Sequence, residues 1–195
     1  MTDSQDYRFD SLRGSAITPH IKEVAALRIA VFREYPYLYD GDDQYEEQYL
    51  KTLSESDKSL VVLCRQDNKV VGASTALPLV DADAMFQEPF SEPERYFYYG
   101  ESVLLPEHRG RGIGKTFFFL REKVARAEGY ERATFCAVKR PENHPRRPSG
   151  YQDLGPLWRK QGFTKTNLTT TYPWKDLDEP EESSKVMEFW EKEIS

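Results

Sequence analysis

Residues 96–138 constrain the fold of this chain more than any other segment. An apolar run over 96–105 predicts a long strand, and a second apolar run over 132–138 predicts another. Between them, one apolar stripe at helical spacing predicts an amphipathic helix that Gly129 ends. The stripe consists of Ile113, Phe117, Leu120, Val124 and Ala127. Strand, helix and strand in this order predict a crossover unit within a sheet that contains a parallel pair.

The other apolar patterns predict helices and strands around this unit. Helices are expected over 18–34, 42–54 and 153–161, strands over 7–12, 59–64, 69–77 and 166–172, and a long loop over 78–95. The tail over 185–190 alternates apolar and polar side chains in part, which predicts a final edge strand. A free edge there would give a homodimer a place to pair. The length of 195 residues is that of one domain, which we assign to residues 1–195.

Composition argues against several classes of protein. A net charge of −6 and a pI near 5.3 argue against a nucleic-acid partner, because such proteins present an excess of Lys and Arg. Cys64 and Cys136 lie in apolar runs and not at a metal-ligand spacing, so we expect buried thiols and no metal. No stretch approaches the ~18 apolar residues of a membrane span. With the polar start of the chain, this predicts a cytoplasmic protein without a membrane partner.

The turn over 109–114 predicts a site for an anion. Its glycines are Gly110, Gly112 and Gly114, and the cations beside them are Arg109, Arg111 and Lys115. Glycine lets a ligand approach the backbone closely, because no Cβ intervenes. The helix that follows begins with unpaired N–H groups and a partial positive charge, which both favour phosphates. Together these features indicate a phosphate-bearing ligand.

Two common phosphate-binding motifs fail at this turn, each by one residue. A P-loop ends in Gly-Lys-Thr, as residues 114–116 do, but its first glycine would fall at Arg109. A dinucleotide fingerprint would need its last glycine at Lys115. The turn therefore favours neither an NTPase nor a nicotinamide-dependent enzyme.

The same turn resembles the pyrophosphate loop of a known family. The segment Arg109-Gly110-Arg111-Gly112-Ile113-Gly114 is similar to the Arg/Gln-x-x-Gly-x-Gly/Ala signature of the GNAT superfamily of acyl-CoA-dependent N-acetyltransferases. The order of elements over 7–173 resembles that family as well, and Gly162-Phe163 stands where it commonly has this pair. The resemblance implies an α/β (α+β) fold with a mixed, mostly antiparallel sheet. In that sheet a parallel pair is splayed at the centre, and helices flank the sheet.

The resemblance also implies a co-substrate, acetyl-CoA, that binds along the turn and the strand before it. The residues in contact would be Val103, Leu104, Leu105, Arg109, Gly110, Arg111, Gly112, Ile113, Gly114, Lys115 and Thr116. Backbone N–H groups of Val103 and Leu105 would bind the pantetheine arm or polarise the thioester carbonyl. The acetyl group would pass directly to a primary amine of a small molecule or a peptide.

Direct transfer needs a neutral amine, and Glu101 is the expected base. Free alkylamines have a pKa near ~10.4 and are mostly protonated at neutral pH, so a proton acceptor is required. Glu101 is the only acid on the predicted strand 96–105 and lies near the point where the family often has a carboxylate. His108 and His144 are alternative bases, and His20 is a weaker one.

One departure from the family concerns the acid that protonates the leaving thiolate. The family frequently has Tyr four residues before the Gly of the Gly-Phe pair, where this chain has Trp158. An indole supplies no proton of useful acidity, so the role is vacant, is taken by a residue such as Tyr151, or is unnecessary. This departure leaves a second interpretation open, in which the domain binds acyl-CoA as a sensor or partner module without turnover.

The segment 139–151 is rich in arginine and proline. In an acidic protein it could bind an anionic acceptor, because the guanidinium fork matches carboxylates and phosphates. It could equally be a solvated loop that touches only the nucleotide end of coenzyme A. In either case it disfavours a polycationic acceptor.

Overall fold

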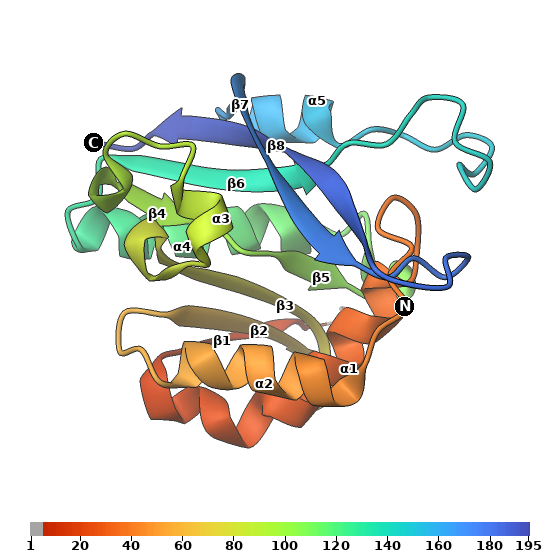
Figure 1. Ribbon diagram of the computed structural model, residues 1–195. Coiled ribbons are helices and arrows are strands. Elements are labelled where there is room, and N and C mark those ends of the chain that lie inside the picture. The colour runs from red at the N-terminus through yellow and green to blue at the C-terminus, as the bar shows by residue number, and fades with distance from the viewer. Residues whose placement is uncertain (1–5) are drawn as a thin grey trace.

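A computed structural model describes residues 6–195, so that part of the polar start of the chain, residues 1–5, lies outside it. Eight strands form one sheet in the order β1-β2-β3-β4-β6-β8-β7, with β5 paired to β3 (Figure 1). They are β1 Arg8–Leu12, β2 Leu60–Gln66, β3 Lys69–Pro78, β4 Tyr96–Tyr98, β5 Ser102–Leu104, β6 Arg132–Val138, β7 Thr164–Trp174 and β8 Ser183–Glu193. All pairs are antiparallel except β4 with β6. This confirms the predicted fold class.

Helices cover both faces of the sheet. They are α1 Ile21–Phe32, α2 Asp43–Ser54, α3 Ala84–Gln87, α4 Ile113–Ala127 and α5 Gly155–Lys160. The first three pack on one face and the last two on the other (Figure 1). The predicted loop 78–95 contains α3 and two short 3-10 turns. No helix within residues 6–195 is long and apolar enough to cross a membrane.

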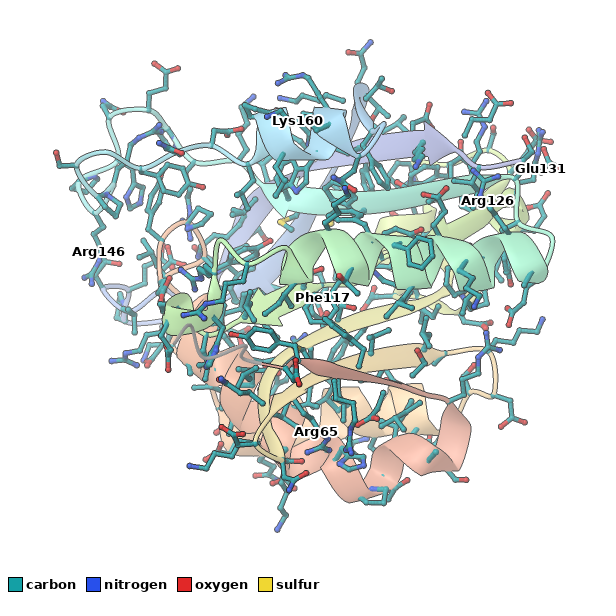
Figure 2. The ribbon with its side chains drawn as sticks, turned by 180° about the vertical axis from the view of Figure 1, so that it is seen from behind. Arg65, Phe117, Arg126, Glu131, Arg146 and Lys160 are labelled. Carbon is teal, nitrogen blue, oxygen red and sulfur yellow. The ribbon has the colours of Figure 1, made fainter. Side chains whose placement is uncertain are left out.

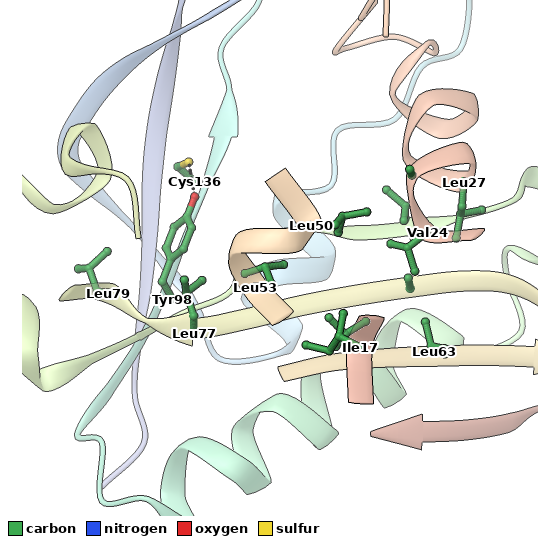
Figure 3. Close-up of a cluster of buried hydrophobic side chains, with 14 of the residues drawn as sticks. Ile17, Val24, Leu27, Leu50, Leu53, Leu63, Leu77, Leu79, Tyr98 and Cys136 are labelled. Carbon is green, nitrogen blue, oxygen red and sulfur yellow. Dashed lines mark hydrogen bonds between the residues drawn. The ribbon is translucent and has the colours of Figure 1, made fainter. Parts of the chain in front are cut away.

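Each face of the sheet has its own apolar core. On the first face, side chains of α1 and α2 such as Val24 and Leu50 pack on those of the central strands (Figure 3). Within that core the hydroxyl of Tyr98 lies 3.2 Å from the thiol of Cys136. The second core lies beneath α4 and is centred on Phe117. Burial of these side chains supplies the main free energy that holds the helices on the sheet.

The predicted long strand over 96–105 is divided by a β-bulge. Between the pairs Leu77↔Tyr98 and Ser74↔Ser102, β3 advances three residues while the opposite chain advances four. The extra residue lies beside Gly100, where a Cβ would come within 2.5 Å of the Thr75 hydroxyl oxygen. Glycine is therefore required there by packing. The bulge separates β4, which pairs with β6, from β5, which pairs only with β3.

The predicted edge strand over 185–190 is wrong in position. These residues belong to β8, which lies between β6 and β7, and β7 is the strand at the edge. The polar positions that suggested an edge are satisfied inside the sheet: Lys185 bonds to Glu179, and Glu188 pairs with Lys139 and Lys165. The homodimer contact predicted through this segment thus has no free edge to use.

Candidate active site

A cleft of about 1040 Å³ opens where β5 separates from β6. Its lining runs from Gly114 and Phe117 of α4, past Leu104 of β5, to Glu101 in the bulge. Phe135–Val138 of β6 form the opposite wall. The cleft therefore passes from the α4 face of the sheet toward the face that α1 and α2 cover. Figure 2 looks onto the α4 face, with Phe117 labelled on that helix.

The glycine turn has the backbone of an anion site. Gly110 and Gly112 have φ of 76° and 83°, in the left-handed region that favours glycine. Within residues 6–195, a Cβ at either position or at Gly114 would meet no heavy atom within 4 Å. These glycines are thus set by backbone conformation and lie beside open space. Gly112 caps α4 without a side chain, so the first-turn amides stay available to a ligand.

The predicted cations of the turn differ in the partners that hold their side chains. Arg109 donates from Nη1 to Glu34 over 2.8 Å and from Nε to the carbonyl of Leu104 over 3.1 Å, so it joins the end of α1 to β5. Arg111 donates to a backbone carbonyl at 3.3 Å. Lys115 is exposed and has no ion-pair partner among the residues that the structure describes. Lys115 is therefore the cation of this turn that is freest to reach an anion.

The other two residues of the predicted turn serve the helix. Ile113 is buried in the core beneath α4, and Thr116 directs its hydroxyl to the carbonyl of Gly112 over 3.4 Å. Both contacts fix the first turn of α4. The backbone amides of both residues can still contact a ligand.

The register of β5 decides which strand amides face the cleft. The amide of Leu105 donates to a carbonyl of β3 over 3.0 Å, and Val103 is paired with β3 as well. Successive amides of a strand point to opposite sides, so those of Ser102 and Leu104 point away from β3 and toward the gap. The predicted donors Val103 and Leu105 are therefore wrong, because one residue of register places their amides inside the ladder. Leu104 alone among the three predicted strand residues directs its amide into the cleft.

Glu101 lies in the cleft because of the bulge. The extra residue turns its side chain to the face of α1 and α2, where it forms an ion pair with Arg28. The Tyr49 hydroxyl donates to its Oε2 over 3.3 Å. Arg28 is buried and also pairs with the buried Glu46. Strict alternation would have turned Glu101 away, so the bulge is what brings the carboxylate to the site.

The histidines and Trp158 lie apart from Glu101. The Nδ1 of His108 lies 3.0 Å from the Tyr7 hydroxyl, and the ring of His144 packs on Tyr35. Neither histidine lines the described part of the cleft. Trp158 does line it, and its ring packs edge-on against Phe135 with centroids 5.0 Å apart. Trp158 is thus a wall of the cleft.

The cations of the segment 139–151 are not equivalent. Arg140 is buried and donates to both oxygens of Asp176 and to two carbonyls of the loop after α1, so it is a structural bridge. Asp176, the partner of Arg140, is buried as well. Arg146 and Tyr151 line the outer part of the cleft, and Figure 2 places Arg146 on a projecting loop. Arg146 can reach a ligand, whereas Arg140 cannot.

Three side chains around Glu101 and the bulge were not found from the sequence. They are Arg28, Ser102 and Arg121. The signal for Arg121 was present, since it follows Phe117 by four residues on the apolar side of α4, where a charge is out of place. The predicted stripe continued instead through Leu120, which is only half-buried. Arg28 gave a comparable signal, because it follows the buried Val24 by four residues on α1. Ser102 gave none, because its position depends on the bulge.

A model of the acetyltransferase (GNAT) family matches residues 24–149, more than half of the chain. The chain belongs to the GNAT acetyltransferase family. The match includes the glycine turn, the bulge and both strands that border the cleft. This family carries out acyl transfer, which confirms the general class of activity that the sequence predicted.

Solved structures support the same fold for this GNAT chain. An N-acetyltransferase from Staphylococcus aureus superposes with a TM-score of 0.64 at 13% identity, over 97% of this chain and 99% of that one. A ribosomal-protein-alanine N-acetyltransferase from Brucella melitensis gives 0.61 at 16% identity, over 96% and 99%. A Salmonella typhimurium structure with its cofactor acetyl-CoA gives 0.61 at 12% identity, over 97% and 95%. No curated protein matches the chain.

Proposed function

We propose that this GNAT chain transfers the acetyl group of acetyl-CoA to a primary amine of a small molecule or a peptide by direct transfer. The observation that carries the proposal is the course of the cleft. It joins an anion-binding helix start at Gly114 to the carboxylate of Glu101 through the gap between β5 and β6. A nucleotide thioester and an amine can therefore enter from opposite faces of the sheet and meet in the gap.

The turn fits the pyrophosphate of acetyl-CoA. The open space beside Gly110, Gly112 and Gly114 admits phosphate oxygens to the amides of the first turn of α4. Lys115 adds a free cation at the same place. The amide of Leu104 and the aromatic wall formed by Trp158 would accompany the pantetheine arm along the cleft.

At the inner end of the cleft, Glu101 takes the proton that the amine must lose. The neutral amine nitrogen attacks the thioester carbon, a C–N bond forms, and the C–S bond breaks with its electron pair going to sulfur. Arg28 and Tyr49 hold the carboxylate in place. Direct transfer is favoured over an acetylated cysteine, because burial raises the pKa of Cys136 in the cleft to about 12 and keeps that thiol protonated.

The test is to incubate the protein with acetyl-CoA and a pool of primary amines, and to measure free thiol. Release of thiol that depends on both the protein and an amine is expected. A non-catalytic acyl-CoA-binding module, which Trp158 at the place of the family's tyrosine favours, would bind acetyl-CoA in calorimetry and release no thiol with any amine. Absence of acetyl-CoA binding would contradict both functions.

A further inference from the structure

Arg121 is a buried charge without a counter-ion. Its side chain is 1% exposed, and it takes part in none of the ion pairs formed within residues 6–195. Its guanidinium donates only to neutral acceptors, which are the carbonyls of Phe117, Thr75 and Glu101 and the hydroxyl of Ser102. Burial of an unpaired charge is costly, so a fold that retains one here invites a search for its missing anion.

The position of Arg121 points to that anion. It lines the cleft on the α4 face, two helical turns and about 10 Å beyond Gly114 along the helix axis. Its Nη2 lies 2.8 Å from the Ser102 hydroxyl, at the point where β5 leaves β6. A molecule that reaches from the glycine turn to the gap must pass this guanidinium. The reacting end of such a molecule therefore lies close to an uncompensated positive charge.

The charges on the two sides of the bulge have opposite sign. On the α1 and α2 face, Glu101 and Glu46 surround Arg28, which leaves one excess negative charge in a buried cluster. On the α4 face, the buried charge beside the bulge is the positive one of Arg121. Acetyl transfer makes the amine nitrogen more positive and the sulfur more negative, so the two buried charges are ordered along the direction of transfer. In a dry gap both act more strongly than they would in water.

We propose that Arg121 stabilises the thiolate that leaves when the amine displaces it from the acetyl group, so that no acid is needed at the position of Trp158. The proposal rests on the proposed function, because it requires coenzyme A in the cleft. The C–S electron pair stays on sulfur as a thiolate beside the guanidinium, and the thiolate takes its proton from water after release. Trp158 is then free to be a wall of the cleft.

The protonation states of Arg121 and of the groups around it support this role. Burial lowers the pKa of Arg121 to about 10, so the side chain is still charged at neutral pH. The titratable groups that act on it are Tyr99, whose ring lies under the guanidinium, and Glu101. Burial raises the pKa of Tyr99, which keeps that hydroxyl neutral. The Glu101 carboxylate lies on the other face and is paired with Arg28.

The test is to measure the pKa of the coenzyme A thiol in its complex with the protein, from the ultraviolet absorbance of the thiolate. We expect the bound thiol to titrate at least about one unit below the thiol of free coenzyme A measured under the same conditions. Arg121→Met should return it toward the free value, whereas Arg121→Lys and Ser102→Ala should keep it lowered, because both retain the charge. If the role of Arg121 were only structural, Arg121→Met would lower the free energy of unfolding and leave the pKa of the bound thiol as in the wild type.

The outcomes separate this proposal from the proposed function. If the wild-type protein binds coenzyme A and the thiol titrates at or above its free value, the role of Arg121 is overturned while acetyl transfer stands. If calorimetry detects no coenzyme A binding, the proposed function fails first. The wild-type titration decides even if Arg121→Met does not fold. In turnover, Arg121→Met should lower kcat at least tenfold with a smaller change in KM for acetyl-CoA.

Discussion

Arg28 illustrates how one side chain can hold a carboxylate in place. It extends from α1 between the carboxylates of Glu46 on α2 and Glu101 in the bulge, with its guanidinium over the ring of Tyr49 at 4.4 Å from the ring centroid. Two helices and the central strand thus converge on one buried cation. The position of the Glu101 carboxylate is therefore set by residues that are distant in the sequence.

Replacing Arg28 by Met should lower the free energy of unfolding by about 3–5 kcal/mol, because it leaves two buried carboxylates without a cation. Urea denaturation would measure the loss. Arg33→Met is the matched control: this arginine is exposed just beyond the same helix, and its replacement should change stability by less than about 0.5 kcal/mol. Equal effects of the two substitutions would contradict the network.

Glu101→Gln should slow turnover by about 10²–10⁴-fold, because the amide keeps the shape of the side chain and accepts no proton. Activity should recover in part at high pH, where more of the amine is already neutral. The pH dependence of kcat checks this. Glu107→Gln, an exposed acid shortly after β5, should leave the profile unchanged. A pH profile unaltered by Glu101→Gln would remove this residue from the reaction.

At the scale of the element, α4 begins at the proposed ligand site and packs on the sheet along its length. Gly112 at its N-terminus and Gly129 just beyond its C-terminus have almost the same φ, 83° and 82°, and both lie in open space within the described structure. The two positions therefore impose the same demand on the backbone. Only Gly112 lies close to the cleft, two residues before Gly114 in its lining, so the two positions separate the effect of strain from the effect on a ligand.

Gly112→Asp should abolish measurable acetyl-CoA binding, because it brings a side chain and a negative charge against the pyrophosphate. Gly129→Asp introduces the same left-handed strain away from the cleft and should leave the affinity within about twofold. Isothermal calorimetry on both folded variants makes the comparison. Unchanged affinity in folded Gly112→Asp would show that the turn does not hold the pyrophosphate.

Further along α4, Glu122 links the helix to β8. Its carboxylate accepts from Lys192 over 2.5 Å and from Arg126 over 2.8 Å. Burial alone would raise its pKa, but these two bonds outweigh it and hold the pKa below the ordinary 4.5. A lowered pKa means that the stabilisation is complete above pH 4.5 and disappears as the pH falls through the folded-state value.

Glu122→Gln should therefore cost about 0.5–1 kcal/mol at pH 7 and almost nothing in strong acid, where the wild-type carboxyl is also neutral. Urea denaturation at several pH values measures the difference. Glu94→Gln is the control, since Glu94 is exposed and forms no ion pair within residues 6–195. A difference that stays constant with pH would contradict the ionic origin.

Elements that depend on local interactions were predicted from the sequence, and features that depend on distant contacts were not. The crossover unit over 96–138 and the hairpin of β2 and β3 depend on local periodicity and turn residues, and both were predicted. The bulge was not, because it is set by the contact of Gly100 with Thr75, 25 residues earlier. The position of β8 inside the sheet was missed for a similar reason. Lys185 of β8 pairs with Glu179 in the loop before that strand, and Glu188 of β8 pairs with Lys165 of β7.

The candidate site likewise contains residues that could be predicted from the sequence and residues that could not. The glycine turn is a contiguous motif, so its residues could be named from the sequence. The direction of the strand amides depends on register, and one residue of register reversed the expectation for Val103 and Leu105. Arg28 and Arg121 are supplied by helices on opposite faces. Their meeting at the bulge is a property of the tertiary structure alone.

At the scale of the whole molecule, the sheet consists of two halves joined by few backbone contacts. β1, β2, β3 and β5 form one half, and β4, β6, β8 and β7 form the other. Within residues 6–195, only the pairs Leu77↔Tyr98 and Pro78↔Phe97 join them through the ladder. A ligand in the gap between β5 and β6 would add contacts to both halves, so ligand binding and stability should be coupled.

Coenzyme A at 100 times its dissociation constant should raise the free energy of unfolding by about 2.7 kcal/mol. Hydrogen exchange should slow at the amides of Ser102 and Leu104, which face the gap, more than at Val103, whose amide is already paired with β3. Gly112→Asp should show neither effect. Protection that is equal at all three amides would place the ligand elsewhere.

The extra residue between Tyr98 and Ser102 changes the parity of the strand. Because a strand has only two faces, a strand that kept every residue but lost the bulge would carry Glu101 from the α1 face to the α4 face, beside Arg121. The amine of the proposed reaction would then meet no base. Deleting the extra residue itself would leave Glu101 on its face, because three residues would then oppose three residues of β3. The face on which Glu101 lies is thus set by an odd or even count of residues.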